Sequence, residues 1–187
     1  GVFVASANLQ GNERTIVLHR LSANGNIATG WAPEGFKLGT SSYSPRPPVV
    51  AHDGAGGVLV GWSEDVALGG PSIVRVHRID AVGVPNAVWP TGGHTIPDAY
   101  DVGLVVDDQH HVFVSTGEYD PVQYRSLGMR VRRLAADATP DPEWPEDGAL
   151  VFPQGSSYGI GLIPDGAGGV FGGWSPGYLC IDFCPPF

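Results

Sequence analysis

The strongest constraint on the fold of this chain is a sequence segment that occurs twice in similar form. AHDGAGGVLVGWSED at residues 51–65 returns as IPDGAGGVFGGWSPG at residues 163–177. When the chain is aligned on the apolar run after the DG turn, four segments correspond position by position: GVFVAS, GVLVGW, HVFVST and GVFGGW, starting at residues 1, 57, 111 and 169. This spacing of about 55 residues predicts a fold built from repeated supersecondary units.

Two independent markers keep the same register. HRLSANG, HRIDAVG and RRLAADA begin at residues 19, 77 and 132, and a W-x-x-x-G motif begins at residues 31, 89 and 144. In each copy the same number of residues separates the second residue of the first marker from the tryptophan of the second. We therefore interpret residues 1–187 as one domain with repeats at about 1–47, 48–101 and 102–158 and a partial fourth at 159–187.

Each repeat has the pattern of four short strands. In the second copy these are PPVVAH, GGVLVGWSE, SIVRVHRID and a shorter AVWP…GHTIP. Val74 and Val76 alternate with Arg75 and His77, which is the period-two pattern of a strand with one apolar face. The turn DGAGG combines an Asp that accepts backbone N–H bonds with glycines that tolerate positive φ. Because Pro and Gly interrupt nearly every window long enough for a helix, the sequence predicts an all-β chain.

Four antiparallel strands in about 55 residues are the layout of a β-propeller blade. An immunoglobulin-like sandwich needs roughly 100 residues per unit, and the coils of β-solenoids are shorter than these repeats. A single blade cannot bury both faces of its sheet, so successive blades must stack. The predicted fold class is therefore an all-β, β-propeller-like array of about three and a quarter four-stranded blades.

The motifs P-V-V-x-x-D-G-x-G-G-V-L-V-x-W, V-x-R-[IL]-x-A-x-G and W-x-x-x-G resemble the repeats of bacterial secreted and cell-surface β-propeller proteins, many of them uncharacterised. The resemblance covers essentially the whole chain. It implies a propeller fold and an extracellular or cell-surface location. It implies no particular activity, because propellers host many functions.

The number of blades is smaller than the four to eight that closed propellers usually have. The first copy lacks its opening strand and DG turn, and the fourth stops after GGVFGGWSPGYLCIDFCPPF. Three explanations are open: a fragment of a propeller of about six to eight blades, two copies closing a ring of about seven, or incomplete ends that complement each other. Because an open stack exposes strand edges and an apolar face, we expect a homo-oligomer or further chain.

Composition and charge exclude several classes of partner. Hydrophobic residues are 42% and aromatic residues 10% of the chain, enough for a packed core despite 28 glycines and 17 prolines. The net charge is −9 and the 10 basic residues form no stripe, which argues against a nucleic-acid partner. No apolar run approaches the roughly 20 residues that span a bilayer, and no signal peptide is visible.

Residues that hold the same place in successive copies are expected to serve the blade itself. We interpret the aspartates as turn caps rather than Ca²⁺ ligands, because DGAGG offers one carboxylate and Ca²⁺ needs several oxygens. The arginines resemble the clustered arginines of sialidases, but one per blade at one register favours stacking on tryptophan or bonding to a neighbouring strand. The tryptophans are interpreted as packing residues. The aspartates, arginines and tryptophans that hold the same place in successive copies are Asp53, Asp107, Asp165, Arg20, Arg78, Arg133, Trp31, Trp89 and Trp144.

The third copy replaces DGAGG with DDQHH, which concentrates metal-binding side chains in one turn. Adjacent histidines on a strand, here His110 and His111, point to opposite faces, so we expect no metal ion at this turn. The sequence places no Ser–His–Asp triad, Cys–His pair or phosphate-binding glycine motif convincingly. We therefore expect no catalytic residue and no cofactor.

Positions where the copies differ are the candidates for binding. Trp62 and Trp174 share a register with Ser6 and Thr116, so they either bind a sugar or peptide or reflect ordinary core variation. The loop that follows varies most, and variable loops on a rigid scaffold are where binding usually occurs. The third version, GEYDPVQYRSLG, is the richest in polar and aromatic groups. Its candidate ligand-binding residues are Glu118, Tyr119, Asp120, Tyr124 and Arg125.

Cys180 and Cys184 are the only cysteines, in the segment LCIDFC. In an extended strand their Cα atoms would lie roughly 13 Å apart, beyond disulfide reach, so a bond between them requires a turn. Two cysteines alone make a poor zinc site. We therefore expect a local disulfide, which would suit a secreted protein.

The sequence leaves three functions open. The first is a non-catalytic binding or scaffolding module of a secreted or surface protein, with a glycan or a protein as ligand. The second is a propeller enzyme that acts on polysaccharide at a central channel assembled from several blades. The third is a purely structural segment of a larger surface protein. We favour the first, because a fully repeated fold shows no catalytic constellation.

Overall fold

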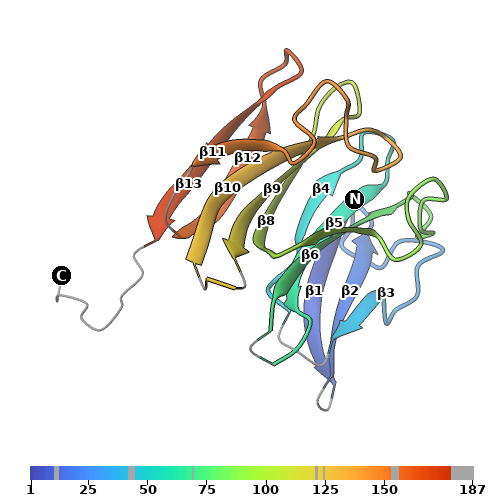
Figure 1. Cartoon of the computed structure of the whole chain (residues 1–187). Coiled ribbons are helices and arrows are strands. Elements are labelled where there is room, and N and C mark those ends of the chain that lie inside the picture. Colours follow the sequence, from blue (N-terminus) through green and yellow to red (C-terminus); the bar gives the residue numbers. More distant parts are fainter. Residues whose placement is uncertain are drawn as a thin grey trace, which may run out of the picture.

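The computed structural model of this chain consists of β-strands joined by turns, as Figure 1 shows. It describes residues 1–10, 13–41, 45–68, 70–120, 122–123, 125–152 and 156–177. These residues contain 13 strands in four antiparallel sheets and no helix. The all-β class predicted from the sequence is confirmed. Within the same residues there is accordingly no helix long and apolar enough to cross a membrane.

Each sheet comes from one contiguous part of the chain. Sheet 1 contains β1 (Val2–Gln10), β2 (Glu13–Leu21) and β3 (Phe36–Ser41). Sheet 2 contains β4 (Val49–His52), β5 (Val58–Asp65), β6 (Ser72–Ile79) and β7 (His94–Pro97). Sheet 3 contains β8 (Ala99–Val106), β9 (Val112–Asp120), β10 (Arg125–Leu134) and β11 (Ala149–Phe152). Sheet 4 contains β12 (Ser156–Pro164) and β13 (Val170–Gly177).

Sheets 2 and 3 are four-stranded meanders in which each strand pairs with its neighbours in sequence. Sheet 1 lacks a counterpart of β4, and the described part of sheet 4 consists of the counterparts of β4 and β5. The four sheets follow one another in chain order like the leaves of a fan (Figure 1). We call the face of a sheet that looks toward the preceding sheet its leading face, and the opposite one its trailing face.

Two strand boundaries differ from the boundaries expected from the repeats. β8 begins at Ala99 and β12 at Ser156, each slightly before the repeat boundary placed from the sequence. In β8 the cause is a bulge between Tyr100 and Val102, where Asp101 has a φ of 46°. A bulge adds a residue without ending the strand, so spacing between motifs does not reveal it. The fourth strand of sheet 2 is also shorter than expected, because Asn86–Trp89 form a turn closed by a bond from the Trp89 N–H to the Asn86 carbonyl.

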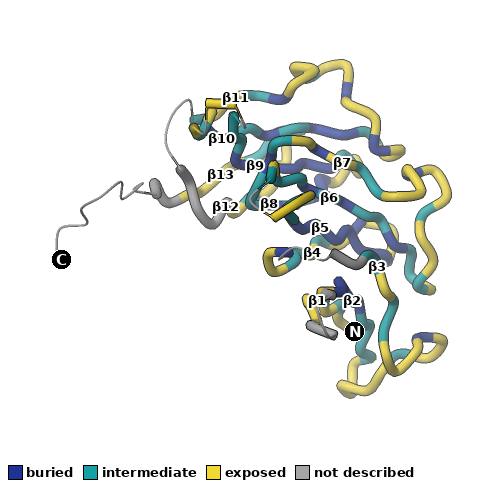
Figure 2. The backbone as a smooth tube through the Cα atoms, turned by 60° about the horizontal axis from the view of Figure 1, so that its bottom comes forward, coloured by how far each residue is buried: buried dark blue, intermediate teal, exposed yellow. Residues whose placement is uncertain are grey.

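The hydrophobic core is divided into layers between successive sheets. One cluster joins the trailing face of sheet 1 to the leading face of sheet 2: Ile16, Leu18, Trp31, Val58, Val60, Trp62 and Ile79. The next joins sheet 2 to sheet 3: Leu59, Val74, Val76, Trp89, Ile96, Ala99, Val106, Val112, Val114, Leu134 and Ala138. Figure 2 shows the buried segments running through the central strands of the stack. Alternate residues of β5 therefore serve different layers, which explains why both faces of this strand are apolar.

Polar bonds between sheets recur with the repeat. Arg20 of sheet 1 donates to the carbonyl oxygen of Ala81 in sheet 2. Arg78 of sheet 2 donates in the same way to the carbonyl of Ala136 in sheet 3, at 3.3 Å. The indole Nε1 of Trp89 also donates to the Ala136 carbonyl, at 2.9 Å. The arginine marker thus joins one sheet to a turn of the next in successive repeats, and Trp89 does the same between sheets 2 and 3.

The W-x-x-x-G motif has a local cause. Gly93, which ends the second copy of the motif, has a φ of 79°, a conformation that L side chains rarely adopt. A Cβ atom there would lie 2.6 Å from the His77 ring and 2.8 Å from the Val76 carbonyl oxygen. Gly35 and Gly148 are equally constrained, with φ of 79° and 83°. Glycine therefore closes the turn that leads into the last strand of each of the first three sheets.

The aspartates of the DG turns cap those turns. Oδ1 of Asp53 accepts from the backbone N–H of Ala55 at 2.8 Å and of Gly57 at 2.7 Å. Its Oδ2 accepts from Nε of Arg78 at 3.1 Å. In sheet 4, two backbone N–H bonds from the turn lower the pKa of the exposed Asp165 carboxyl below its ordinary value. One carboxylate thus caps each of these two turns through two backbone N–H groups.

Candidate functional site

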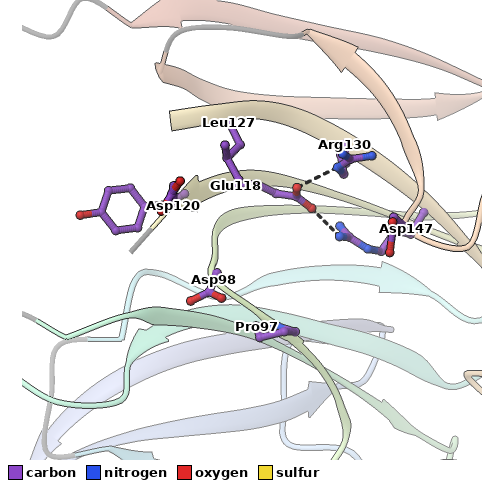
Figure 3. A pocket seen from close by; sticks show the side chains of 9 residues that line it. Pro97, Asp98, Glu118, Asp120, Leu127, Arg130 and Asp147 are labelled. Atoms are coloured by element: carbon purple, nitrogen blue, oxygen red, sulfur yellow. Dashed lines mark hydrogen bonds and ion pairs between the residues drawn. The ribbon is translucent and has the colours of Figure 1, made fainter. Parts of the chain in front are cut away.

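A groove of about 340 Å³ opens where the end of sheet 2 meets sheet 3. We call it the Glu118 groove, after the residue at its centre in Figure 3. The chain contributes to it from four places: the β7–β8 junction, the end of β9, strand β10 and the turn before β11. Its lining residues are Pro97, Asp98, Glu118, Tyr119, Asp120, Leu127, Arg130, Arg132 and Asp147.

Two arginines hold the Glu118 carboxylate from both sides (Figure 3). Nε of Arg130 donates to Oε2 at 2.8 Å, and Nη2 of Arg132 donates to Oε1. The arginines are held in turn, because Arg130 also donates to the Gly148 carbonyl at 3.1 Å and Arg132 to Oγ1 of Thr116 at 2.9 Å. Charge-assisted bonds of this kind fix guanidinium orientation. The groove therefore has a rigid polar centre.

The strand register explains why these side chains meet. β9 and β10 are antiparallel, with Arg130 opposite Thr116 and Gly128 opposite Glu118. Side chains two residues apart on a strand lie on the same face, so Thr116 and Glu118 share a face with Arg130 and Arg132. A bulge between Ser126 and Gly128 shifts the register near the turn of the hairpin. The centre of the groove thus belongs to the leading face of sheet 3.

Two further carboxylates flank this centre without being engaged by it. The side chains of Asp98 and Asp147 make no hydrogen bond or ion pair within the residues that the structure describes, whereas Oδ1 of Asp120 accepts from the N–H groups of Val122 and Gln123. Four carboxylates and two guanidinium groups line the groove in all. It therefore offers free acceptors beside fixed donors and carries net negative charge.

A second hollow of about 260 Å³ adjoins the groove and shares Pro97, Arg132 and Asp147 with it. His94 lies in its wall, on β7. Burial, reinforced by the charge of Arg132, lowers the pKa of His94 below its ordinary value. At neutral pH the imidazole is therefore uncharged and can both donate and accept a hydrogen bond. The two hollows are therefore neighbours that meet at these three shared residues.

Sheet 2 carries a different version of the same constellation. There Nε of Arg75 donates to Oε1 of Glu64 at 2.6 Å, and Nε1 of Trp62 donates to Oε2 at 3.3 Å. The Trp62 ring stacks on His77, with centroids 5.1 Å apart. A Cβ atom on Gly39 of sheet 1 would lie 3.3 Å from the same indole, so this place is filled.

In sheet 3 two residues have been exchanged together. Thr116 stands at the register of Trp62, and Arg132 stands at the register of His77. The small threonine removes the indole, and the arginine reaches the glutamate that the indole would have bonded. Pro97 occupies the register that Gly39 holds in sheet 1. This paired exchange turns a packed aromatic contact into a charged groove.

Several residues predicted from the sequence line the groove, but not on a loop. Glu118, Tyr119 and Asp120 all line it. They belong to β9, and Arg125 begins β10, so the expected loop at 117–128 is mostly strand. Nε of Arg125 lies 3.9 Å from Asp120, and its side chain is largely exposed outside the lining. Tyr124 lies outside the described residues.

The two tryptophans predicted as binding residues lie away from the groove. Trp62 is only 1% exposed and packs in the core between sheets 1 and 2, as the alternative of core variation requires. A side chain in that position has no surface to offer a ligand, so we do not retain it in the site. Trp174 is 39% exposed, and its ring centroid lies 6.0 Å from that of Phe152.

The repeat-locked residues of sheet 3 form a network of their own. Nε of Arg133 donates to Asp141 at 2.8 Å, Nη2 donates to Glu143 at 2.8 Å, and Nη1 reaches the Gly168 carbonyl of sheet 4 at 3.2 Å. The guanidinium also lies over the Trp144 ring, 5.6 Å from its centroid. Arg133 thus does both things considered from the sequence: it stacks on its own tryptophan and bonds the next sheet.

The DDQHH turn is organised by hydrogen bonds. Nδ1 of His111 lies 2.8 Å from Oδ2 of Asp107, while His110 has a φ of 66° and its ring lies against Gly54 of sheet 2. In the part of the chain that the structure describes, no three His, Cys, Asp or Glu side chains gather as a metal site. Cys180 and Cys184, with the disulfide predicted for them, lie outside the described residues.

Sequence reasoning missed six of the residues that line the groove: Pro97, Asp98, Leu127, Arg130, Arg132 and Asp147. Arg132 had a detectable signal, since it replaces the histidine of the first two HR markers. Asp98 had none, and the W-x-x-x-G motif marks the turn that carries Asp147 without showing that this turn meets the groove. No known protein family, curated protein or solved structure matches this chain.

Proposed function

We propose that this chain is a non-catalytic binding module of β-propeller type, from a secreted or cell-surface protein, and that the Glu118 groove binds a glycan. The propeller assignment is supported by four sheets stacked in chain order with apolar layers and recurring polar bonds between them. The observation that carries the binding proposal is the paired exchange at Thr116 and Arg132, which replaces the packed contact of sheet 2 with a polar groove in sheet 3.

The chemistry of the groove suits a polyhydroxylated ligand. A sugar hydroxyl both donates and accepts, so it can donate to Asp98 or Asp147 and accept from an arginine N–H in the same site. Pro97 and Leu127 add apolar surface against which the C–H face of a sugar ring could rest. A peptide rich in basic residues would satisfy the carboxylates but would offer the arginine N–H groups few acceptors. Neutral glycans therefore fit the mixed lining better.

The same geometry favours binding over catalysis. A glycosidase needs one carboxyl group that gives a proton and a second that acts as base or nucleophile. Both oxygens of Glu118 accept from arginine, which leaves this carboxylate suited to positioning rather than proton donation. The polysaccharide enzyme and the purely structural segment remain the alternatives that the experiment below separates.

The test converts the groove of sheet 3 into the packed version of sheet 2. The variant Thr116→Trp/Arg132→His rebuilds the stacked pair opposite Pro97 rather than glycine, so circular dichroism first checks that it is folded. We expect it to lose glycan binding at least tenfold in a glycan array followed by titration calorimetry. Asp98→Asn and Asp147→Asn, which leave Glu118 and both arginines in place, should each weaken binding about tenfold, as loss of a hydrogen bond to a charged group does. Arg125→Ala, at an exposed position outside the lining, is the matched control.

Three results would contradict the proposal. Glycan binding that is unchanged in Thr116→Trp/Arg132→His would place the site elsewhere. Release of reducing ends or unsaturated products from a bound polysaccharide would favour the enzyme. Failure of the wild-type chain to bind any glycan or basic peptide would favour the structural segment.

A further inference from the structure

The two ends of the stack expose the faces that its interior covers. Phe171 of β13 is 64% exposed, whereas its repeat equivalents Leu59 and Phe113 are 0% exposed beneath the following sheet. Ile163 of β12, which pairs with Phe171, is 63% exposed. The trailing face of sheet 4 therefore presents an apolar surface of the kind that is buried in sheets 2 and 3.

The leading face of sheet 1, at the other end of the stack, is exposed as well. Val2 and Val4 of β1 are 54% and 42% exposed, while their equivalents in sheet 2, Val58 and Val60, lie in the core between sheets 1 and 2. Gly25 likewise has nothing within 4 Å of a Cβ position, whereas a Cβ on its equivalent Gly83 would lie 3.2 Å from Trp31 of the preceding sheet. The contact surface of this sheet is present but uncovered.

We infer that the trailing face of sheet 4 binds the leading face of sheet 1 in a second copy of this chain. Both internal layers of the core consist of a trailing face packed on a leading face, so the surface complementary to Phe171 and Ile163 is one that the chain itself displays at Val2 and Val4. Valine on one side and a larger apolar side chain on the other is also the pairing inside the stack, where Leu59 shares a layer with Val112 and Val114.

Such a joint is head-to-tail, because it uses different surfaces of the two copies. Head-to-tail joints either close into a ring or continue as a filament. Two copies contribute eight sheets, counting the two-stranded sheet 4 of each as a layer (four sheets in each chain), and closed propellers have about four to eight blades. Closure by two copies therefore uses the same joint twice and leaves neither face exposed. This inference is independent of the groove and its ligand.

The test is the mass of the whole chain in solution, measured by light scattering and sedimentation over a range of concentrations. We expect the mass to rise from the 19.6 kDa of one chain to twice that value. Phe171→Glu and Val4→Glu should each leave a monomer, because each buries an unpaired charge in both joints of the ring. Leu68→Glu, on an exposed side chain outside both faces, is the control and should leave the assembly unchanged.

A mixture of the two variants gives the decisive result. The Phe171→Glu chain keeps a sound leading face and the Val4→Glu chain a sound trailing face, so together they can form one joint. We expect the mixture to dimerise more weakly than the wild type, while each variant alone stays monomeric. A wild-type chain that remains at 19.6 kDa at all concentrations would overturn the inference. So would assembly that survives both substitutions, as pairing through strand edges would, or variants that do not complement each other.

Discussion

The indole of Trp62 lies parallel to the imidazole of His77, with ring centroids 5.1 Å apart and planes inclined by 14°. The pair sits between sheets 1 and 2, and Trp62 belongs to the apolar layer that joins them. A buried tryptophan at such a junction stabilises two sheets at once.

Trp62→Ala should lower the free energy of unfolding by about 3–5 kcal/mol, the usual cost of truncating a buried aromatic side chain. Trp174→Ala removes the same side chain at the equivalent position of sheet 4, where it is partly exposed, and should cost less than half as much. Urea unfolding followed by circular dichroism measures both. Equal losses would show that the layer between sheets 1 and 2 is not closed around Trp62.

Gly93→Ala should be strongly destabilising, although it adds a single methyl group. Positive φ costs an L residue roughly 1–2 kcal/mol, and the new Cβ would meet the Val76 carbonyl, so we expect a total of about 2–4 kcal/mol. The neighbouring Gly92 has open space around its Cβ position, and Gly92→Ala should change stability by no more than about 0.5 kcal/mol. Thermal unfolding of the two variants side by side checks the difference.

The motifs of the sequence predicted this local structure well, because they report on backbone geometry. A DG turn needs a capping carboxylate, and Asp53 supplies it; a left-handed turn needs glycine, and Gly93 supplies it. Alternation in Val74 and Val76 reflects a strand with one face on the next sheet. Requirements of this kind are satisfied within a few residues, so a single sequence displays them.

The groove was only partly predictable, because it depends on contacts between distant segments. Glu118 was singled out, but its bonds to Arg130 and Arg132 follow from a hairpin register that includes a bulge. Asp147 stands at a variable position of the W-x-x-x-G motif, which marks a turn but does not show that the turn lines a groove. The burial of Trp62 depends on Gly39 in another sheet, and the sequence near Trp62 does not indicate that contact.

Asp141→Ala should cost about 3 kcal/mol, because Arg133 and Asp141 are both 8% exposed and an uncompensated buried charge is expensive. Glu143, which also bonds Arg133, is largely exposed and compensates little. Arg125→Ala breaks the exposed pair with Asp120 and should cost at most about 1 kcal/mol. Denaturant midpoints at low and high salt separate the two, since salt should matter mainly for the exposed pair.

Stability should fall in acid through the same network. Burial raises the pKa of Asp107, but hydrogen bonds from His111 and Gln109 outweigh it and leave the pKa below its ordinary value. The Arg133 bond lowers the pKa of Asp141 as well. A lowered carboxyl pKa stabilises the fold above the unfolded value of about 3.9, and this stability is lost as pH falls through the folded pKa. Asp141→Asn should be less stable at pH 7 and show a shallower decline below pH 4 than the wild type; parallel declines would exclude Asp141 as a source.

Histidine titration should give the free energy of unfolding a second, weaker dependence on pH between pH 7 and pH 5. Burial and then the charge of Arg75 lower the pKa of His77, so the folded state favours the neutral ring. The unfolded chain then binds more protons below about pH 6.5, and stability decreases as pH falls through the folded pKa. His77→Phe keeps an aromatic ring against Trp62 without a titrating group, and should reduce this slope in chemical unfolding. His94→Gln should reduce it further, because the pKa of His94 is lowered too.

Between sheets 2 and 3, the main-chain oxygen of Ala136 accepts hydrogen bonds from both Arg78 and Trp89. A backbone carbonyl is present whatever side chain the residue carries. The turns DAVG and AADA, which play this role in successive sheets, can therefore diverge in sequence while the arginine and the tryptophan stay recognisable. Tolerance to substitution should thus be high in the turns that accept these bonds and low at the arginine and tryptophan that donate them. Repeats of this type can therefore diverge in sequence while the contact between their sheets is kept.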